Sequence, residues 1–226
     1  MDPFGVYVTG TDTGIGKTLA SCTLLHALRG QGLRAIGMKP VASGCDWSGD
    51  GWRNADALAL QEAGEPGIDY ADINPFALER PLAPELAARD AGTEVSLPPI
   101  LAAHARLAKR AEAVVVEGVG GWAAPLSASL MQADVVRALR LPVLLVVGLR
   151  LGCLSHALLS ARAIAGDGLQ LAGWIGSHVD PGMERVEDNL AMLRARLPAA
   201  CWGVLPHAPA AAPASLARHL RIPALP

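Results

Sequence analysis

The run "GTDTGIGKT", from Gly10 to Thr18, ends in a lysine followed by a threonine. In a phosphate-binding loop, backbone N–H groups and the positive start of a helix hold phosphate oxygens. The lysine ammonium reaches the outer phosphates and the hydroxyl ligates Mg²⁺. The usual spacing of such a loop has a glycine where this chain has Thr11. The alternative to a phosphate-binding loop is therefore a glycine turn that precedes a helix. The expected nucleotide contacts are Gly14, Ile15, Gly16, Lys17 and Thr18.

A second lysine, Lys39, lies in "GMKPVASG" at the end of the next β-rich run. A lysine at a strand end beside a phosphate loop can hold an anionic intermediate. The hydroxyl of Ser43 and the turn at Gly44 can add hydrogen-bond donors. Taken alone, Lys39 also fits a surface lysine before a proline turn, but the neighbouring loop favours a role in the site.

Two carboxylates fit a magnesium site. Mg²⁺ in nucleotide sites is commonly held by the loop hydroxyl and one or two carboxylates. Glu117 follows the apolar run "AVVV", as a Walker B acid does, and Asp56 comes two residues after a predicted helix cap, Asn54. The alternative for Asp56 is a charge that stabilises a helix N-terminus. The predicted Mg²⁺ ligands are therefore Thr18, Asp56 and Glu117.

These side chains need a scaffold, and six β-rich apolar runs supply it. Continuous apolarity indicates strands covered on both faces, and the runs alternate with helical patterns. We predict an α/β fold with a mostly parallel sheet and helices on both faces. In such sheets ligands gather at the carboxyl ends of the strands. The predicted strands lie at 5–9, 34–41, 113–118, 142–148, 171–179 and 201–206.

Helical spacing predicts helices over 18–32 and 153–168, each stopped by glycine, and a third that starts after Asn54. The proline-interrupted segment from Pro75 to Pro99 is expected to hold one short helix at most. We expect this segment to leave the regular α/β pattern on the side where the substrate binds.

Composition limits the partners. The 226 residues, 51% hydrophobic, suit one domain over 1–226. With 19 basic against 21 acidic residues and no basic run, neither nucleic acid nor a membrane surface is an expected partner. Four scattered cysteines argue against zinc or disulfides, and the start of the chain lacks a secretory pattern, so a cytoplasmic location is expected. The six histidines lack paired spacing, and Trp122 and Trp174 are expected in the core or at a dimer contact.

Several segments together resemble the dethiobiotin synthase family of P-loop NTPases: "GTDTGIGKT", "MKPVASG", "RNADALAL", "EGVGGW", "LPVLLVVGLRLGCLSHALLSARAI" and "LAGWI". The resemblance runs in order from about Val6 to about Pro206. It implies a homodimer that converts 7,8-diaminononanoate (7,8-diaminopelargonate), CO₂ and ATP, with Mg²⁺, to dethiobiotin, ADP and phosphate in biotin biosynthesis. One amine forms a carbamate, the γ-phosphoryl group moves to the carbamate, and the second amine closes the ureido ring with loss of phosphate.

The resemblance also implies roles for individual residues. Thr13 and Lys17 would bind phosphates and carbamate, and Lys39 and Ser43 would bind carbamate and diamine. Thr11 to Thr13 would turn hydroxyls and a carboxylate towards the reacting groups. The turn of Gly152 and Cys153, with Ser155 where the family usually has asparagine, would receive the substrate carboxylate across the dimer interface. Ser177 stands at the usual adenine-reading asparagine, which predicts weaker selectivity among nucleotides.

Three other classes share the loop. Partitioning and metallocentre-maturation ATPases usually carry a lysine where this chain has Asp12. A GTP-binding switch protein would show an NKxD motif, which this chain lacks. An amidoligase of the cobyrinate type normally needs an attached glutaminase domain. These differences favour the resemblance to the dethiobiotin synthase family, which implies an ATP-dependent ligase.

Overall fold

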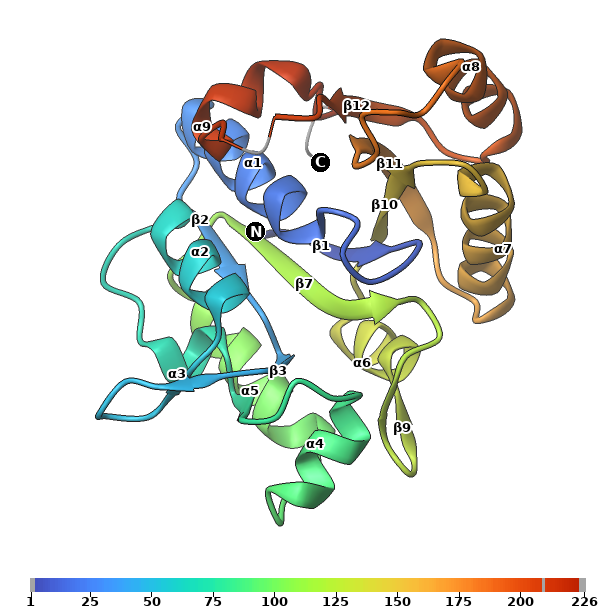
Figure 1. Cartoon of the computed structure of the whole chain (residues 1–226). Coiled ribbons are helices and arrows are strands. Elements are labelled where there is room, and N and C mark those ends of the chain that lie inside the picture. The colour runs from blue at the N-terminus through green and yellow to red at the C-terminus, as the bar shows by residue number, and fades with distance from the viewer. Residues whose placement is uncertain (1–2, 209, 224–226) are drawn as a thin grey trace.

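Six parallel strands form the central sheet of the computed structural model, which describes residues 3–208 and 210–223 (Figure 1). The strand order is β2-β7-β1-β10-β11-β12, so the first strand lies in the middle of the sheet. Each of the six predicted runs forms one of these strands, which confirms the parallel α/β fold. The strands are β1 (Phe4–Gly10), β2 (Ala35–Met38), β7 (Ala113–Gly121), β10 (Val143–Leu149), β11 (Leu171–His178) and β12 (Cys201–Leu205).

Helices cover both faces of the sheet, as the apolar runs predict. Along β1, Val6 and Val8 pack on one face and Tyr7 on the other, because successive side chains of a strand alternate. The first face is covered by α1 (Lys17–Gly30), α2 (Ala55–Ala63) and α9 (Pro213–Leu216). The opposite face carries α5 (Leu97–Ala108), α6 (Gln132–Leu139), α7 (Cys153–Gly166) and α8 (Val186–Arg196).

Asn54 caps α2, as predicted. Its Oδ1 accepts hydrogen bonds from the backbone N–H groups of Asp56, at 3.0 Å, and Ala57, at 3.4 Å. Such a cap stabilises a helix by about 1 kcal/mol. It also fixes Asp56 in the first helical turn, so the residue that starts the helix places a carboxylate at the carboxyl edge of the sheet.

The segment between β2 and β7 holds small elements. Two short strands, β3 (Val41–Ser43) and β6 (Phe76–Leu78), pair in parallel, and β4 (Asp46–Trp47) and β5 (Trp52–Arg53) form a hairpin. The expectation of one short helix at most in 75–99 is wrong in part. Besides α4 (Pro84–Asp90), this segment holds β6 and the start of α5. Both helices have proline in the first turn, where it is tolerated because the first turn of a helix leaves its N–H groups without partners. The remaining elements are α3 (Tyr70–Ile73), β8 (Pro125–Ser127), β9 (Leu130–Met131) and a 3₁₀ turn, Ala217–His219.

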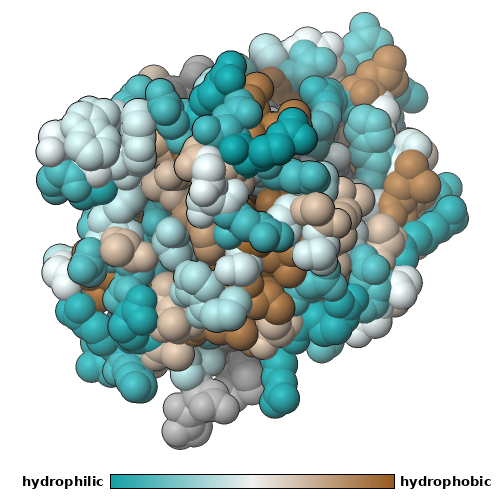
Figure 2. All heavy atoms as spheres, turned by 90° about the horizontal axis from the view of Figure 1, so that it is seen from below, coloured by the Kyte–Doolittle hydropathy of each residue, from teal (hydrophilic) through white to brown (hydrophobic). Residues whose placement is uncertain are grey.

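The face that carries α4 and β9 is mixed in character (Figure 2). Hydrophobic side chains gather near its centre and hydrophilic side chains surround them. Within the described residues, every helix is too short or too polar to cross a bilayer.

Candidate active site

The loop between β1 and α1 has the backbone that phosphate binding needs. Gly14 and Gly16 have positive φ angles of 71° and 80°, and residues with a Cβ rarely adopt such backbone angles. A Cβ on Gly16 would also lie 2.6 Å from the hydroxyl oxygen of Ser177. The Nζ of Lys17 donates to the carbonyl of Asp12 at 3.0 Å, so the lysine folds back over its own loop.

The segment that precedes these glycines is tied to the strand beside it. The hydroxyl of Thr11 accepts a hydrogen bond from the Gly148 N–H at 3.2 Å, and Asp12 forms an ion pair with Arg150. The hydrogen bond from the Thr13 N–H to Asp12, together with Arg150, lowers the pKa of the Asp12 carboxyl. The expectation that Thr11 to Thr13 all face the reacting groups is therefore wrong for two of them. Thr11 and Asp12 anchor the loop, and only Thr13 lines the cavity.

Lys39 joins both predicted carboxylates in one cluster, in which Lys39 and Glu117 are buried and Asp56 is half-exposed. Its Nζ lies 2.6 Å from Glu117 Oε1 and 3.0 Å from Asp56 Oδ2, and it donates to the Gly118 carbonyl at 3.3 Å. Burial disfavours the ammonium, but the carboxylates outweigh burial, and the pKa of Lys39 lies above its ordinary value. Lys39 is therefore a cation with only 4% of its surface exposed. The alternative of a surface lysine is wrong.

Glu117 is fully buried and has bonding capacity to spare. Its Oε1 accepts from the Thr18 hydroxyl at 2.9 Å and from Lys39, whereas Oε2 has no hydrogen-bond partner among the described residues. A buried carboxylate oxygen without a partner is costly unless a ligand meets it. Burial raises the pKa of the Asp56 carboxyl, but Lys39 outweighs burial, and the net shift is downward. Asp56 and Glu117 thus flank one cation, the Lys39 ammonium.

The position of Lys39 depends on a residue that sequence reasoning missed. The Asn74 side chain donates to the Lys39 carbonyl at 2.7 Å, and the Lys39 N–H donates to the carbonyl of Ile73 at 2.7 Å. The Tyr70 hydroxyl in turn donates to Asn74 Oδ1 at 3.0 Å. No local pattern marks Asn74, because its partner lies 35 residues away in the sequence.

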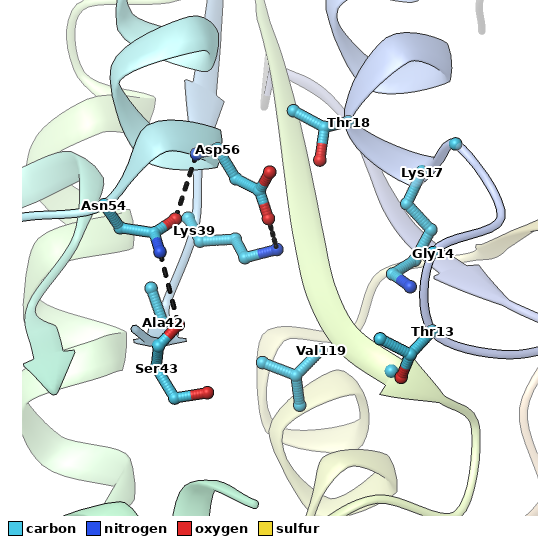
Figure 3. A pocket seen from close by; sticks show the side chains of 12 residues that line it. Thr13, Gly14, Lys17, Thr18, Lys39, Ala42, Ser43, Asn54, Asp56 and Val119 are labelled. Carbon is cyan, nitrogen blue, oxygen red and sulfur yellow. Dashed lines mark hydrogen bonds and ion pairs between the residues drawn. The ribbon is translucent and has the colours of Figure 1, made fainter. Parts of the chain in front are cut away.

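A cavity of about 260 Å³ opens between the loop and this cluster (Figure 3). Lys17 and Lys39 approach it from opposite sides, and the Ser43 hydroxyl points into it. Burial, and then the positive charge of Lys39, lower the pKa of Lys17 to about 8. The predicted residues that line the cavity are Thr13, Gly14, Gly16, Lys17, Thr18, Lys39, Ser43 and Asp56.

A second cavity, of about 730 Å³, shares Thr13 and Ser43 with the first. Its outer wall is apolar and comes from the α4 and β8 regions. The wall includes Pro81, Leu82, Pro84, Ala124 and Pro125. The two cavities together offer a polar end with two lysines and an adjoining end for an aliphatic chain.

Other predicted residues lie outside these cavities. The Ile15 side chain packs in the core beside α1, so only its backbone can serve a ligand. Ser177 is buried behind Gly16 at the end of β11. At the start of α7, the Cys153 side chain is buried and its N–H already donates to the Arg150 carbonyl at 3.0 Å.

Trp122 and Trp174 pack in the core, one of the two places predicted for them. Trp174 is fully buried, and Trp122 is 4% exposed, with its indole N–H donating to Asp167 at 2.7 Å.

The donors that could hold a divalent cation are Thr18, Asp56 and Glu117. In the part of the chain that the structure describes, no cluster of three or more histidine, cysteine or acidic side chains is suited to a metal. Two carboxylates and a hydroxyl fit Mg²⁺ nonetheless, because that ion keeps several waters and takes few protein ligands. The unpartnered Oε2 of Glu117 supports this fit.

The parallel sheet, the loop that joins β1 to α1 and the acid on β7 define an α/β protein of the P-loop class. A family model described as an AAA domain matches residues 5–215. Among solved structures, the signal recognition particle receptor FtsY from Elizabethkingia anophelis is 15% identical, with a TM-score of 0.54. That match covers 97% of this chain and 61% of the receptor. The MinC:MinD cell division complex from Aquifex aeolicus is also 15% identical, with a TM-score of 0.54 and coverage of 91% and 82%. These similarities show the fold alone.

Curated relatives are much more similar. The ATP-dependent dethiobiotin synthetase BioD of Xanthomonas euvesicatoria pv. vesicatoria is 64% identical over 96% of this chain and 97% of the relative. The protein of that name from Xanthomonas oryzae pv. oryzae strain PXO99A is 63% identical over 99% and 100%, and that from Xylella fastidiosa is 61% identical over 95% and 95%. The chain belongs to the ATP-dependent dethiobiotin synthetase family.

Proposed function

We propose that this protein uses ATP and CO₂ to convert 7,8-diaminononanoate to dethiobiotin, ADP and phosphate. The observation that carries the proposal is the pair of buried lysines, Lys17 and Lys39, on opposite sides of one cavity beside two carboxylates. A carbamate and a γ-phosphate are both anions that repel each other. Two ammonium groups in a poorly solvated cavity supply the charge that brings them together. Relatives that carry the dethiobiotin synthetase name support the choice of substrate.

Each side chain then has a defined task. One substrate amine attacks CO₂, and the carbamate is held by Lys39, Thr13 and Ser43. Lys17 binds the γ-phosphate oxygens, so that the carbamate oxygen attacks phosphorus and ADP leaves. The second amine then attacks the carbonyl carbon and closes the ureido ring, and phosphate departs. Catalysis in this scheme is positioning and charge stabilisation, as in other phosphoryl transfers.

Thr18, Asp56 and Glu117 would hold Mg²⁺. The ion would supply positive charge to the phosphate oxygens. Two of these ligands are the partners of Lys39 in the structure. The same carboxylates therefore serve as counter-ions for the lysine and as donors for the ion.

The apolar wall beside Thr13 and Ser43 suits the aliphatic chain of the diamine. In this proposal its carboxylate ends at Gly152, Cys153 and Ser155 of a second copy, which makes the protein a homodimer. Leu151, next to this turn, is 95% exposed in the single chain, as a residue covered by a partner would be. Because the Cys153 N–H is already bonded, the N–H groups that follow it are the donors in this proposal.

Two broader assignments belong to the same proposal. We assign residues 1–226 to one domain, and a single sheet that takes strands from Phe4 to Leu205 supports this assignment. The location is the cytoplasm, and the four free thiols, Cys22, Cys45, Cys153 and Cys201, suit a reducing compartment.

The test is to incubate the protein with the diamine, bicarbonate, Mg²⁺ and ATP and to measure dethiobiotin by mass spectrometry. We expect dethiobiotin and ADP in equal amounts, and neither when the diamine is omitted. ATP hydrolysis that does not depend on the diamine, with no dethiobiotin formed, would overturn the proposal and favour an ATPase of the partitioning type.

A further inference from the structure

Gln132, the first residue of α6, is a fully buried amide beside the carboxyl end of β7, which follows Glu117. Its Oε1 accepts hydrogen bonds from the Val119 N–H at 2.8 Å and from the Tyr7 hydroxyl at 3.2 Å. Its Nε2 donates to the Gly121 carbonyl at 3.1 Å, the Thr9 hydroxyl at 3.2 Å and the Trp122 carbonyl at 3.4 Å. One side chain thus holds three backbone groups of the segment 119–122.

The first of these bonds bears on Lys39. The carbonyl of Gly118 and the N–H of Val119 belong to one planar trans peptide, so they point in opposite directions. Gln132 takes the N–H from one side, and the Gly118 carbonyl accepts from Lys39 Nζ on the other side at 3.3 Å. Rotation of this peptide would move the carbonyl away from the ammonium.

The contact around this peptide leaves no room for a side chain. A Cβ added to Gly118 would overlap Gln132 Oε1 and would lie 2.7 Å from the Tyr7 hydroxyl oxygen. Burial, and then the carboxylate of Glu117, raise the pKa of Tyr7 above its ordinary value, so its hydroxyl remains a donor to Gln132. The Gln132 amide is therefore held by Tyr7 while it holds the 118–119 peptide.

We propose that Gln132 is a positioning residue for Lys39 in the carboxylation reaction. It acts by fixing the plane of the 118–119 peptide, and it touches neither substrate nor nucleotide. The alternative role is purely structural, in which the amide only satisfies buried polar groups and stabilises the fold. The two roles differ in whether turnover by correctly folded protein changes.

The test replaces Gln132 by methionine, which has similar size but no hydrogen-bonding amide, and compares it with Tyr7→Phe. The tyrosine change removes one bond to the same amide and leaves the Val119 bond in place. For Gln132→Met we expect kcat to fall about tenfold, the effect of one lost hydrogen bond in the transition state. The Kd for ADP should change less than about twofold, because the phosphate loop is untouched. For Tyr7→Phe we expect kcat within about twofold of wild type.

A kcat of folded Gln132→Met within about twofold of wild type would overturn the proposal, as would an equal loss in Tyr7→Phe. If Gln132→Met does not fold, Gln132→Glu decides, because it keeps an acceptor for the Val119 N–H. Glutamate loses the bonds to the Gly121 and Trp122 carbonyls, so we expect its kcat to fall less than about tenfold when the Val119 amide stays protected from exchange, and a larger loss with that amide protected would contradict the role.

The kinetic assay rests on the proposed function, so a second readout is independent of it. In hydrogen–deuterium exchange, the amides of residues 118–122 should exchange faster in Gln132→Met than in wild type. Those of β10 should serve as an unchanged reference. Unchanged exchange at 118–122 would overturn the positioning role. Failure of wild type to make dethiobiotin would count only against the proposed function.

Discussion

The two halves of the carboxyl edge of the sheet are built differently. Around β1, β2 and β7, Lys17, Lys39 and Glu117 are buried, and Lys39, only 4% exposed, is bonded to both Glu117 and Asp56. Around β10, β11 and β12, Leu151 is 95% exposed and His178 carries a buried Nε2 with no partner among the described residues. Groups that stabilise developing charge must be in place before the reaction, whereas groups that read a ligand can be completed by the ligand or by a second chain.

The replacement Lys39→Ala should have the largest effect on the first half. It removes the cation proposed to hold the carbamate, so dethiobiotin formation should fall about 1000-fold or more. The Kd for ADP should change little, because the loop is intact. These quantities would be measured by mass spectrometry and by calorimetry.

Two checks accompany this variant. The change leaves two carboxylates without their partner, which can cost about 3–5 kcal/mol of stability, so folding must be verified by circular dichroism. The matched control is Lys109→Ala, at an exposed lysine. Wild-type turnover by Lys39→Ala would remove Lys39 from the mechanism.

The replacement Glu117→Gln should have the next largest effect. It keeps the shape and the acceptor for the Thr18 hydroxyl but removes the charge proposed to hold Mg²⁺. We expect Mg²⁺-dependent activity to fall about 100-fold or more. Steady-state rates across a Mg²⁺ titration would measure this, with the exposed Glu112→Gln as control. A loss below about tenfold would indicate a structural role.

The pH dependence of nucleotide binding should follow Lys17. Its pKa is lowered to about 8, so below that pH the ammonium is present and affinity for ADP should be flat. Above about 8 the free protein loses this proton, and affinity should fall by up to about tenfold per pH unit. Calorimetry in buffers of different ionisation enthalpy should show proton uptake on binding above pH 8. Affinity that stays constant up to pH 10 would contradict this prediction.

The smallest effect is expected in the second half. Ser177 is shorter than the adenine-reading asparagine that the family resemblance places at this position, so we expect it to offer fewer contacts to the base. GTP and CTP should support dethiobiotin formation within about tenfold of ATP, because one missing base contact is worth about 1–2 kcal/mol. Competition with ATP in the mass assay would measure this. Strict preference for ATP would show that other residues of this half read the base.

Patterns local in the sequence predicted the scaffold and half of the site. Six apolar runs gave the six parallel strands, and Asn54 capped the helix that carries Asp56. The glycine and lysine spacing gave a loop whose Gly14 and Gly16 adopt positive φ angles. Each of these signals depends on neighbours within a few residues, which is why the sequence could reveal them.

Contacts between distant segments were not predictable in the same way. Tyr7 and Gln132 are 125 residues apart, and Asp12 and Arg150 are 138 apart. Neither pair belongs to a motif, and both depend on strand order in the sheet. The expectation that Asp12 faces the reacting groups failed for this reason, because its ion pair with Arg150, the residue after β10, forms only when β1 and β10 are neighbours.

The pairing of Lys39 with Asp56 and Glu117 also has a consequence for folding without ligands. Lys39 lies between Asp56 and Glu117 and contacts both, so the two acidic side chains have a basic partner before any ligand arrives. Sites made only of acids must wait for a metal ion before their repulsion is relieved. We therefore expect newly made chains of this protein to fold without magnesium or ATP, so that a shortage of either would lower turnover and leave the amount of folded protein unchanged.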